Sequence, residues 1–154
     1  MFGHHVLRRE QSLPGSPDAV FPFFADAGNL EAITPPWLRF EVVTPRPIAM
    51  RPGALIEYRL GLHGLPVSWL TRIEEWEPGV RFVDMQLTGP YKLWHHTHEF
   101  RPGPDGGTVM TDTVRYALPL GPLGALAHRG LVRRDVERIF DFRARAVPAL
   151  VTAP

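Results

Sequence analysis

Residues 124–150, GALAHRGLVRRDVERIFDFRARAVPAL, carry the longest helical pattern in the chain. At 100° per residue the apolar side chains gather on one face and most charged side chains on the opposite face. The apolar face consists of Ala125, Val132, Val136, Ile139, Phe140, Ala146, Val147 and Leu150. Arg143 interrupts this face. A helix with one apolar face needs a partner surface, which the preceding residues must supply.

The final helix carries two interruptions of its own. Leu123, Leu126 and Leu131 lie on a different face from the later apolar residues, so we expect a change of helix geometry near Gly130. Pro148 should limit the far end, because proline cannot donate a backbone hydrogen bond.

The residues before the final helix predict one strand, two short helices and then six strands. Ser16 and Pro17 fit the N-cap and the first position of the first helix, and Asn29 fits the cap of a second helix at Leu30–Ile33. The strands are expected at Val6–Ser12, Arg39–Thr44, Ala54–Leu62, Val67–Trp76, Arg81–Leu87, Tyr91–Arg101 and Thr108–Leu118. Short turns rich in Pro and Gly separate the last six strands, which predicts an antiparallel meander.

These elements predict an α+β fold in a single domain over residues 1–154. A curved antiparallel sheet of about seven strands would wrap around the long C-terminal helix, with the two short helices after the first strand. Such a layering often leaves a cavity between sheet and helix, and a ligand would bind there.

Composition narrows the classes of function. The chain has no cysteine, which excludes disulfides and thiolate chemistry and suits a cytoplasmic location. With 17 basic and 16 acidic side chains the net charge is +1, so we expect no nucleic-acid partner. No apolar run approaches the roughly 20 residues of a membrane span, and Met1–Glu10 lacks the apolar core of a secretory signal.

The strand expected at Tyr91–Arg101 holds two candidate functional histidines. It alternates one set, Trp94, His96, His98 and Phe100, with another, Leu93, His95, Thr97 and Glu99. The first set has aromatic residues at both ends and should face the interior. His96 and His98 could then contact a ligand, transfer protons or form satisfied hydrogen bonds within the core.

A pair of histidines two residues apart also suggests a metal site. Zinc needs a third protein ligand, which Asp84, Asp112 or His95 would have to provide. Nothing else in the spacing supports a metal, so we predict no metal site and no cofactor.

In the strand expected at Thr108–Leu118, Asp112 and Tyr116 should face inward, because the alternate positions, which include Thr111, are more polar. A buried carboxylate is costly unless it is paired, so Asp112 requires a cation. Arg143 or a protonated histidine could provide it. Alternatively, Arg143 could extend to the helix edge or bind a carboxylate of the ligand.

The order of the elements and four local motifs resemble the START-like, Bet v 1-type superfamily, also called SRPBCC. The motifs are Ser16–Phe21; Asn29–Pro35; the segment Phe82–Gln86 with Gly89–Tyr91, Trp94, His96, His98 and Phe100; and Gly107–Thr108 with Asp112, Val114, Tyr116 and Pro119–Gly121. They are similar to a bacterial subgroup described as ligand-binding or cyclase/dehydrase-like. The resemblance implies a helix-grip fold.

The resemblance bears on two residues whose orientation the sequence leaves open. Hydrophobicity turns Val83 and Met85 inward and leaves Asp84 and Gln86 outside. The superfamily pattern marks Asp84 and Gln86 instead, and the turn at Gly89-Pro90 does not decide between the two registers.

The resemblance and the residues together predict a cavity that binds a hydrophobic or aromatic small molecule, lipid-like or polyketide-like. The expected ligand-binding residues are Trp69, Asp84, Gln86, Trp94, His96, His98, Asp112, Tyr116 and Arg143. The alternative is an enzyme of the polyketide cyclase/dehydratase type, in which cavity His, Asp, Tyr and Arg side chains transfer protons and polarise carbonyl groups. The pattern identifies no catalytic set and no oligomeric state.

Overall fold

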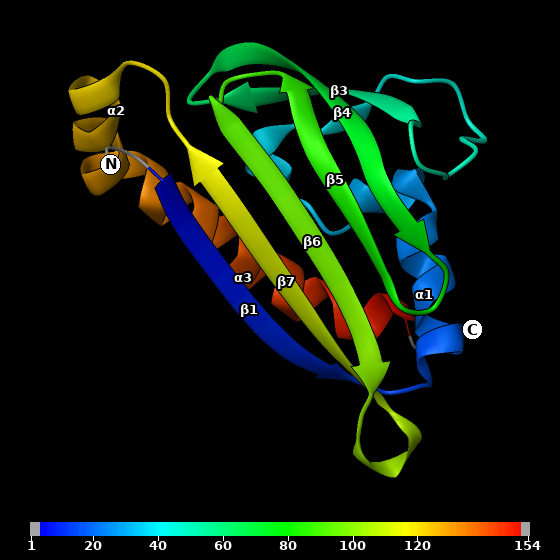
Figure 1. Cartoon of the computed structure of the whole chain (residues 1–154). Coiled ribbons are helices and arrows are strands. Elements are labelled where there is room, and N and C mark those ends of the chain that lie inside the picture. The colour runs from blue at the N-terminus through cyan, green and yellow to red at the C-terminus, as the bar shows by residue number, and fades with distance from the viewer. Residues whose placement is uncertain (1–3, 152–154) are drawn as a thin grey trace.

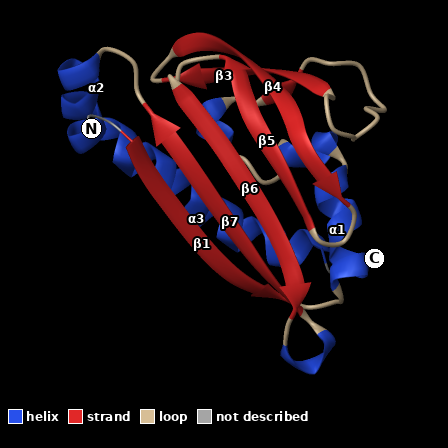
Figure 2. Cartoon of the chain, in the orientation of Figure 1, coloured by secondary structure: helices blue, strands red, loops and turns tan. Residues whose placement is uncertain are grey.

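The computed structural model describes residues 4–151, and in it a seven-stranded antiparallel sheet curves around the long C-terminal helix (Figure 1). The strands are β1 (His4–Leu13), β2 (Glu41–Val42), β3 (Leu55–Leu62), β4 (Leu65–Glu77), β5 (Arg81–Thr88), β6 (Leu93–Pro102) and β7 (Thr108–Ala117). The helical elements are α1 (Pro17–Ala25), η1 (Ala27–Leu30), η2 (Pro36–Leu38), η3 (Pro104–Gly106), α2 (Gly121–Ala127), η4 (His128–Val132) and α3 (Arg133–Val151). Figure 2 shows α1 and α3 on one side of the sheet.

The strand order is β1-β7-β6-β5-β4-β3-β2, with antiparallel pairing throughout. This confirms the predicted meander, which β1 completes by pairing with β7. The pairing of β4 with β5 shifts register at Leu70/Thr71 and again at Ile73/Glu75. Such irregularities bend a strand and increase its twist, and so help the sheet to curve around α3.

The final helix follows the predicted pattern over most of its length. The expected change of geometry near Gly130 is the π-helical turn η4, between α2 and α3. Val136, Phe140 and Val147 are buried, as the apolar face predicts, whereas Leu150 is 36% exposed. Within the described residues no helix is both long enough and apolar enough to cross a membrane.

Pro148 does not end the helix as predicted, because α3 continues to Val151. A proline at this position leaves the carbonyl of Ala144, four residues earlier, without its helical donor. The side chain of Gln11 on β1 donates a 2.6 Å hydrogen bond to that carbonyl. The sheet therefore supplies the partner that the proline removes.

The segment after α1 differs from the sequence prediction. The expected helix at Leu30–Ile33 is replaced by the 3₁₀ turn η1, and Asp26 caps it by accepting a hydrogen bond from the amide of Gly28. Asn29 instead donates to the carbonyl of Phe23 at 2.9 Å. The strand expected at Arg39–Thr44 shrinks to the two residues of β2, because Arg39 is left-handed (φ 49°) and the prolines beyond Thr44 cannot donate to a ladder.

Thr111 was expected to face water but is only 1% exposed. It lies between Glu10 of β1 and Glu99 of β6 in the ladder. Arg101 donates to the Thr111 hydroxyl at 3.3 Å and also pairs with Glu10 at 3.3 Å. On the outer face of the sheet, the long side chains of Arg101 and Glu10 therefore cover the short side chain of Thr111.

Candidate functional site

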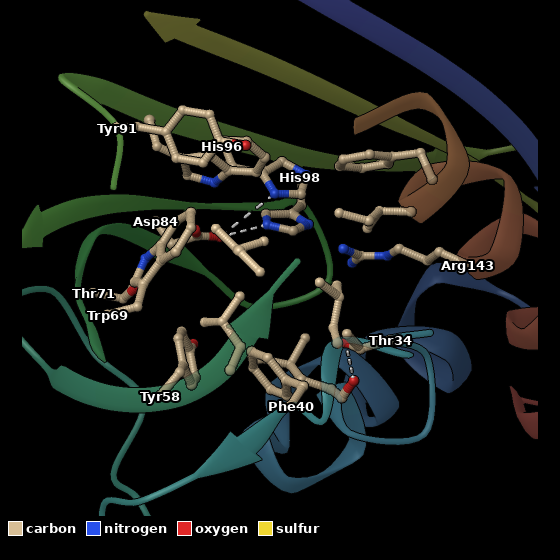
Figure 3. A pocket seen from close by; sticks show the side chains of 17 residues that line it. Thr34, Phe40, Tyr58, Trp69, Thr71, Asp84, Tyr91, His96, His98 and Arg143 are labelled. Atoms are coloured by element: carbon tan, nitrogen blue, oxygen red, sulfur yellow. Dashed lines mark hydrogen bonds and ion pairs between the residues drawn. The ribbon is translucent and has the colours of Figure 1, made fainter. Parts of the chain in front are cut away.

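A cavity lies between the inner face of the sheet and α3 (Figure 3). Its volume is about 150 Å³. One water needs only about 10–15 Å³, so the cavity has room for an organic molecule. Its lining residues are Leu30, Thr34, Leu38, Phe40, Tyr58, Leu60, Leu62, Trp69, Thr71, Asp84, Tyr91, Trp94, His96, His98, Ile139, Phe140 and Arg143.

Aromatic side chains form much of the cavity wall. Trp69 on β4 meets Trp94 on β6 edge to face, with ring centres 5.3 Å apart and planes at 86°. Tyr91 packs against both indoles at 5.6 and 4.9 Å. Phe40 and Tyr58 contribute a second aromatic pair, with ring centres 4.8 Å apart. The two tryptophans therefore line the cavity where the sequence placed them, and their flat surfaces suit an apolar or aromatic ligand.

Two histidines and two aspartates form a cluster at the cavity wall, in which His96, His98 and Asp112 are buried and Asp84 is partly exposed. The rings of His96 and His98 stack with centres 3.6 Å apart and planes at 26°. Asp84 lies on one side of this stack, with Oδ2 at 2.6 Å from His98 Nε2 and 4.0 Å from His96 Nδ1. Asp112 lies on the other side, with Oδ1 at 2.7 Å from His96 Nε2 and 3.1 Å from His98 Nδ1.

The cluster shifts the pKa values of its two histidines in opposite directions. Burial, reinforced by the neighbouring charge of His98, lowers the pKa of His96 to about 4, so this ring is neutral. Burial also disfavours charge on His98, but the flanking carboxylates of Asp112 and Asp84 outweigh it and raise the pKa of His98. One stacked ring is therefore neutral while the other favours a proton.

The two carboxyl groups stay ionised despite their burial. Burial alone raises the pKa of Asp84, but the hydrogen bond from His98 and the positive charges of His98 and Arg143 lower it below its usual value. For Asp112 the effect of burial is outweighed by the charge of Arg143, by the hydrogen bond from His96 and by the nearby ring of His98, which hold its pKa well below the usual range. The cluster thus presents fixed negative charge on both sides of the imidazoles.

Arg143 extends from α3 into the cavity toward Asp84 and His98 (Figure 3). Its Nε and one terminal nitrogen are buried and have no hydrogen-bond partner in the described part of the chain. The guanidinium carbon lies 5.9 Å from the ring centre of Phe24 and 5.8 Å from that of Phe140. No carboxylate oxygen of residues 4–151 lies within 4.0 Å of a guanidinium nitrogen of Arg143. The sequence left open whether Arg143 pairs with Asp112, and the structure shows influence through charge but no direct contact.

Three predicted ligand-binding residues lie inside the protein without lining this cavity. Gln86 donates to the carbonyl of Tyr91 at 2.7 Å and accepts from the Tyr91 amide at 3.1 Å, which holds the β5–β6 turn. The hydroxyl of Tyr116 shares a 2.8 Å hydrogen bond with His128. Asp112 lies behind the histidine pair. All three support the cavity wall, and their contact with a ligand stays a prediction.

Other lining residues were not singled out from the sequence. Trp69, Thr71 and Ile73 are alternate residues of β4 and therefore share one face of the strand. The period of two in β4 could thus have identified Thr71 as an inward-facing residue. Phe40 and Thr34 come from the irregular segments around η2, for which periodicity gives no signal.

A curved antiparallel sheet that holds a C-terminal helix, with a cavity between them, defines the helix-grip fold of the START-like, Bet v 1-type superfamily. Residues 4–152 match the family model described as polyketide cyclase / dehydrase and lipid transport. The chain belongs to this family. A comparison with curated protein sequences gave no match.

Solved structures confirm the fold. The protein TTHA0849 of Thermus thermophilus is 24% identical with a TM-score of 0.70, over 96% of this chain and 97% of that one. The Zhui aromatase/cyclase of a Streptomyces species is 16% identical with a TM-score of 0.75, over 96% and 93%. A START superfamily protein of Mycobacterium smegmatis is 14% identical with a TM-score of 0.68, over 96% and 99%. At these identities the similarity concerns the fold.

Proposed function

We propose that this protein binds a small hydrophobic or aromatic molecule in the cavity between the sheet and α3, and that it does so in the cytoplasm. The aromatic wall around Trp69 and Trp94 supplies the apolar contact area. The family description, which includes polyketides and lipids, agrees with a ligand of this kind. The absence of cysteine supports the cytoplasmic location.

The observation that carries the proposal is the unpartnered guanidinium of Arg143. Burying a charged donor without a partner is costly, so its two free nitrogens favour a ligand that brings an oxygen acceptor. Asp84 and His98 lie opposite, on the sheet side of the cavity. We therefore propose a ligand with an apolar or aromatic body and a carbonyl or carboxylate oxygen directed at Arg143.

Native mass spectrometry of the purified protein, followed by a thermal-shift panel of lipids and aromatic ketones, tests the proposal. A co-purifying molecule or a stabilising compound is expected, and Trp69→Ala should reduce that stabilisation. Trp37→Ala is the matched control, because Trp37 is 42% exposed, packs beneath Arg138 at 5.1 Å and does not line the cavity. No bound molecule and no thermal shift with any compound would contradict ligand binding.

The Asp84–His98 pair favours catalysis as a second candidate function. A carboxylate and an imidazole 2.6 Å apart at a cavity wall can hold or transfer a proton, and Arg143 can polarise a carbonyl group. A cyclase/dehydratase would convert a poly-β-keto chain into a cyclised product. His98→Gln should then abolish product formation while the chain still binds. Binding without turnover in the wild-type protein would exclude this activity for that substrate.

A further inference from the structure

We propose that Asp84, His96 and His98 form a binding site for a divalent transition metal such as Zn²⁺ at the cavity wall. One donor atom from each residue lies within 4.8 Å of the other two. Asp84 comes from β5 and both histidines from β6, so the sheet itself holds the three ligands in register. The sequence offered Asp84, Asp112 or His95 as a third ligand without deciding among them and predicted no metal site, whereas the structure brings Asp84 together with both histidines.

The donor types fit zinc, and the distances between the donors lie on either side of the spacing that zinc needs. Two imidazole nitrogens, one carboxylate oxygen and one open position are a known combination for this ion. Tetrahedral bonds of about 2.0–2.1 Å set neighbouring donors about 3.3 Å apart. Asp84 Oδ2 lies 2.6 Å from His98 Nε2 and 4.0 Å from His96 Nδ1. Loading the ion therefore requires one distance to open and the other to close by about 0.7 Å each, within reach of small side-chain rotations.

Asp112 provides a second and independent observation. Histidines that bind a metal almost always donate their other ring N–H to a carboxylate or carbonyl, which fixes the tautomer. The same oxygen of Asp112 lies 2.7 Å from His96 Nε2 and 3.1 Å from His98 Nδ1, the two nitrogens that point away from Asp84. Asp112 accepts the proton of His96 Nε2, which turns the Nδ1 lone pair of that ring toward Asp84. His98 Nδ1 has no hydrogen bond in the present geometry, and a bond to Asp112 on loading would direct the Nε2 lone pair of His98 to the ion.

The open position of this site faces the cavity, since all three ligands line it. Asp112 opposes the charge of Arg143, so the nearby guanidinium is partly neutralised within the same cluster. A divalent ion together with Asp84, Asp112 and Arg143 carries a single net positive charge. The fourth ligand would then be water or an anionic oxygen of the organic molecule.

The test is the binding of Co²⁺ and Zn²⁺ to the chelator-treated protein of residues 1–154 without any organic molecule. We expect one ion per chain by calorimetry and the intense visible absorption of four-coordinate Co²⁺. Asp84→Asn and His98→Gln should abolish that absorption, and Asp112→Asn should weaken affinity by about 10–100-fold. Circular dichroism identifies any variant that fails to fold, and the wild-type titration does not depend on a variant.

His63→Gln is the matched control, because His63 forms an exposed histidine–carboxylate pair of 2.6 Å with Asp135. It should leave the cobalt spectrum and the stoichiometry unchanged. Two results would overturn the proposal: no stoichiometric binding to the wild-type protein, or binding that survives Asp84→Asn and His98→Gln and is lost with His63→Gln. Since no organic ligand is present, either result leaves the proposed cavity function intact.

Discussion

Two stacked histidine pairs occupy opposite surroundings in this protein. His96 and His98 stack at 3.6 Å between two carboxylates at the cavity wall. His5 of β1 and His128 of the π turn stack at 3.4 Å with planes at 9°, and the hydroxyl of Tyr116 lies 2.8 Å from His128 Nε2. The rings are alike, but one pair has acidic neighbours on both sides and the other is flanked by the basic Arg133.

The difference shows that the neighbouring carboxylates, and not the stacking of the rings, determine whether a histidine pair can hold a positive charge. Burial comes first among the causes that lower the pKa of both His5 and His128, and neighbouring positive groups add to it. That pair is neutral and joins the start of the final helix to β1. The pair at the cavity can hold a positive charge, either a proton or a metal ion, because Asp84 and Asp112 compensate it.

The largest expected effect comes from removing one carboxylate of the cavity pair. Asp112→Asn should lower the free energy of unfolding by about 3 kcal/mol, since it leaves buried charge without its partner. Urea denaturation of the metal-free protein at pH 7 measures the change. His63→Gln serves as the control and should alter stability by no more than about 0.5 kcal/mol, because the His63 side chain is 52% exposed. Equal effects of the two substitutions would show that the carboxylates do not stabilise the cavity pair.

A smaller effect is expected from acidification of the second pair. The groups that face it are His4, Arg133 and Glu137, of which only Glu137 favours its protonation. With a lowered folded pKa, the unfolded state binds more protons below about pH 6.5, so stability falls as the pH drops. One group contributes at most about 1.4 kcal/mol per pH unit. His128→Phe should reduce the pH slope of unfolding between about pH 7 and 5.5, and an unchanged slope would contradict the account.

The smallest expected effect concerns the hydroxyl that supports the second pair. Tyr116→Phe removes the 2.8 Å hydrogen bond to His128 and should lower stability by about 1 kcal/mol. The cavity should be unaffected, because Tyr116 does not line it. Urea denaturation and ligand titration on the same preparation separate the two results, and a loss of ligand affinity alone would assign Tyr116 to the binding site after all.

Some of this site follows from local sequence patterns. The period of two in β6 places His96 and His98 inward without knowledge of any other strand. The period of the final helix likewise places Arg143 on the inner face. These inferences hold because each needs only the geometry of one element.

The other features of the site depend on how the strands pair and on how the final helix packs against the sheet. Asp84 lies opposite His96, even residue against even residue, and this parity follows from the length of the β5–β6 connection. Hydrophobicity alone predicted that Asp84 faces outward, because burying a carboxylate is costly. In the structure His98 offsets that cost, and this pairing is not visible in the local sequence around Asp84. Whether Arg143 reaches a carboxylate depends on the distance between α3 and the sheet, which no helical period encodes.

The central claim is that Arg143 binds an oxygen acceptor on a hydrophobic ligand, and one calorimetric comparison tests it most directly. The probes are 2-acetylnaphthalene and 2-ethylnaphthalene, which have the same carbon skeleton and differ in that the ketone has a carbonyl oxygen in place of two hydrogens. The wild-type protein should bind the ketone about 10–100-fold more tightly, as expected for a hydrogen bond to a buried charged group. Arg143→Met should abolish this preference, and Arg138→Met, on the outer face of the same helix, should retain it. A ketone preference that persists in Arg143→Met, or is absent from the wild-type protein, would contradict the account.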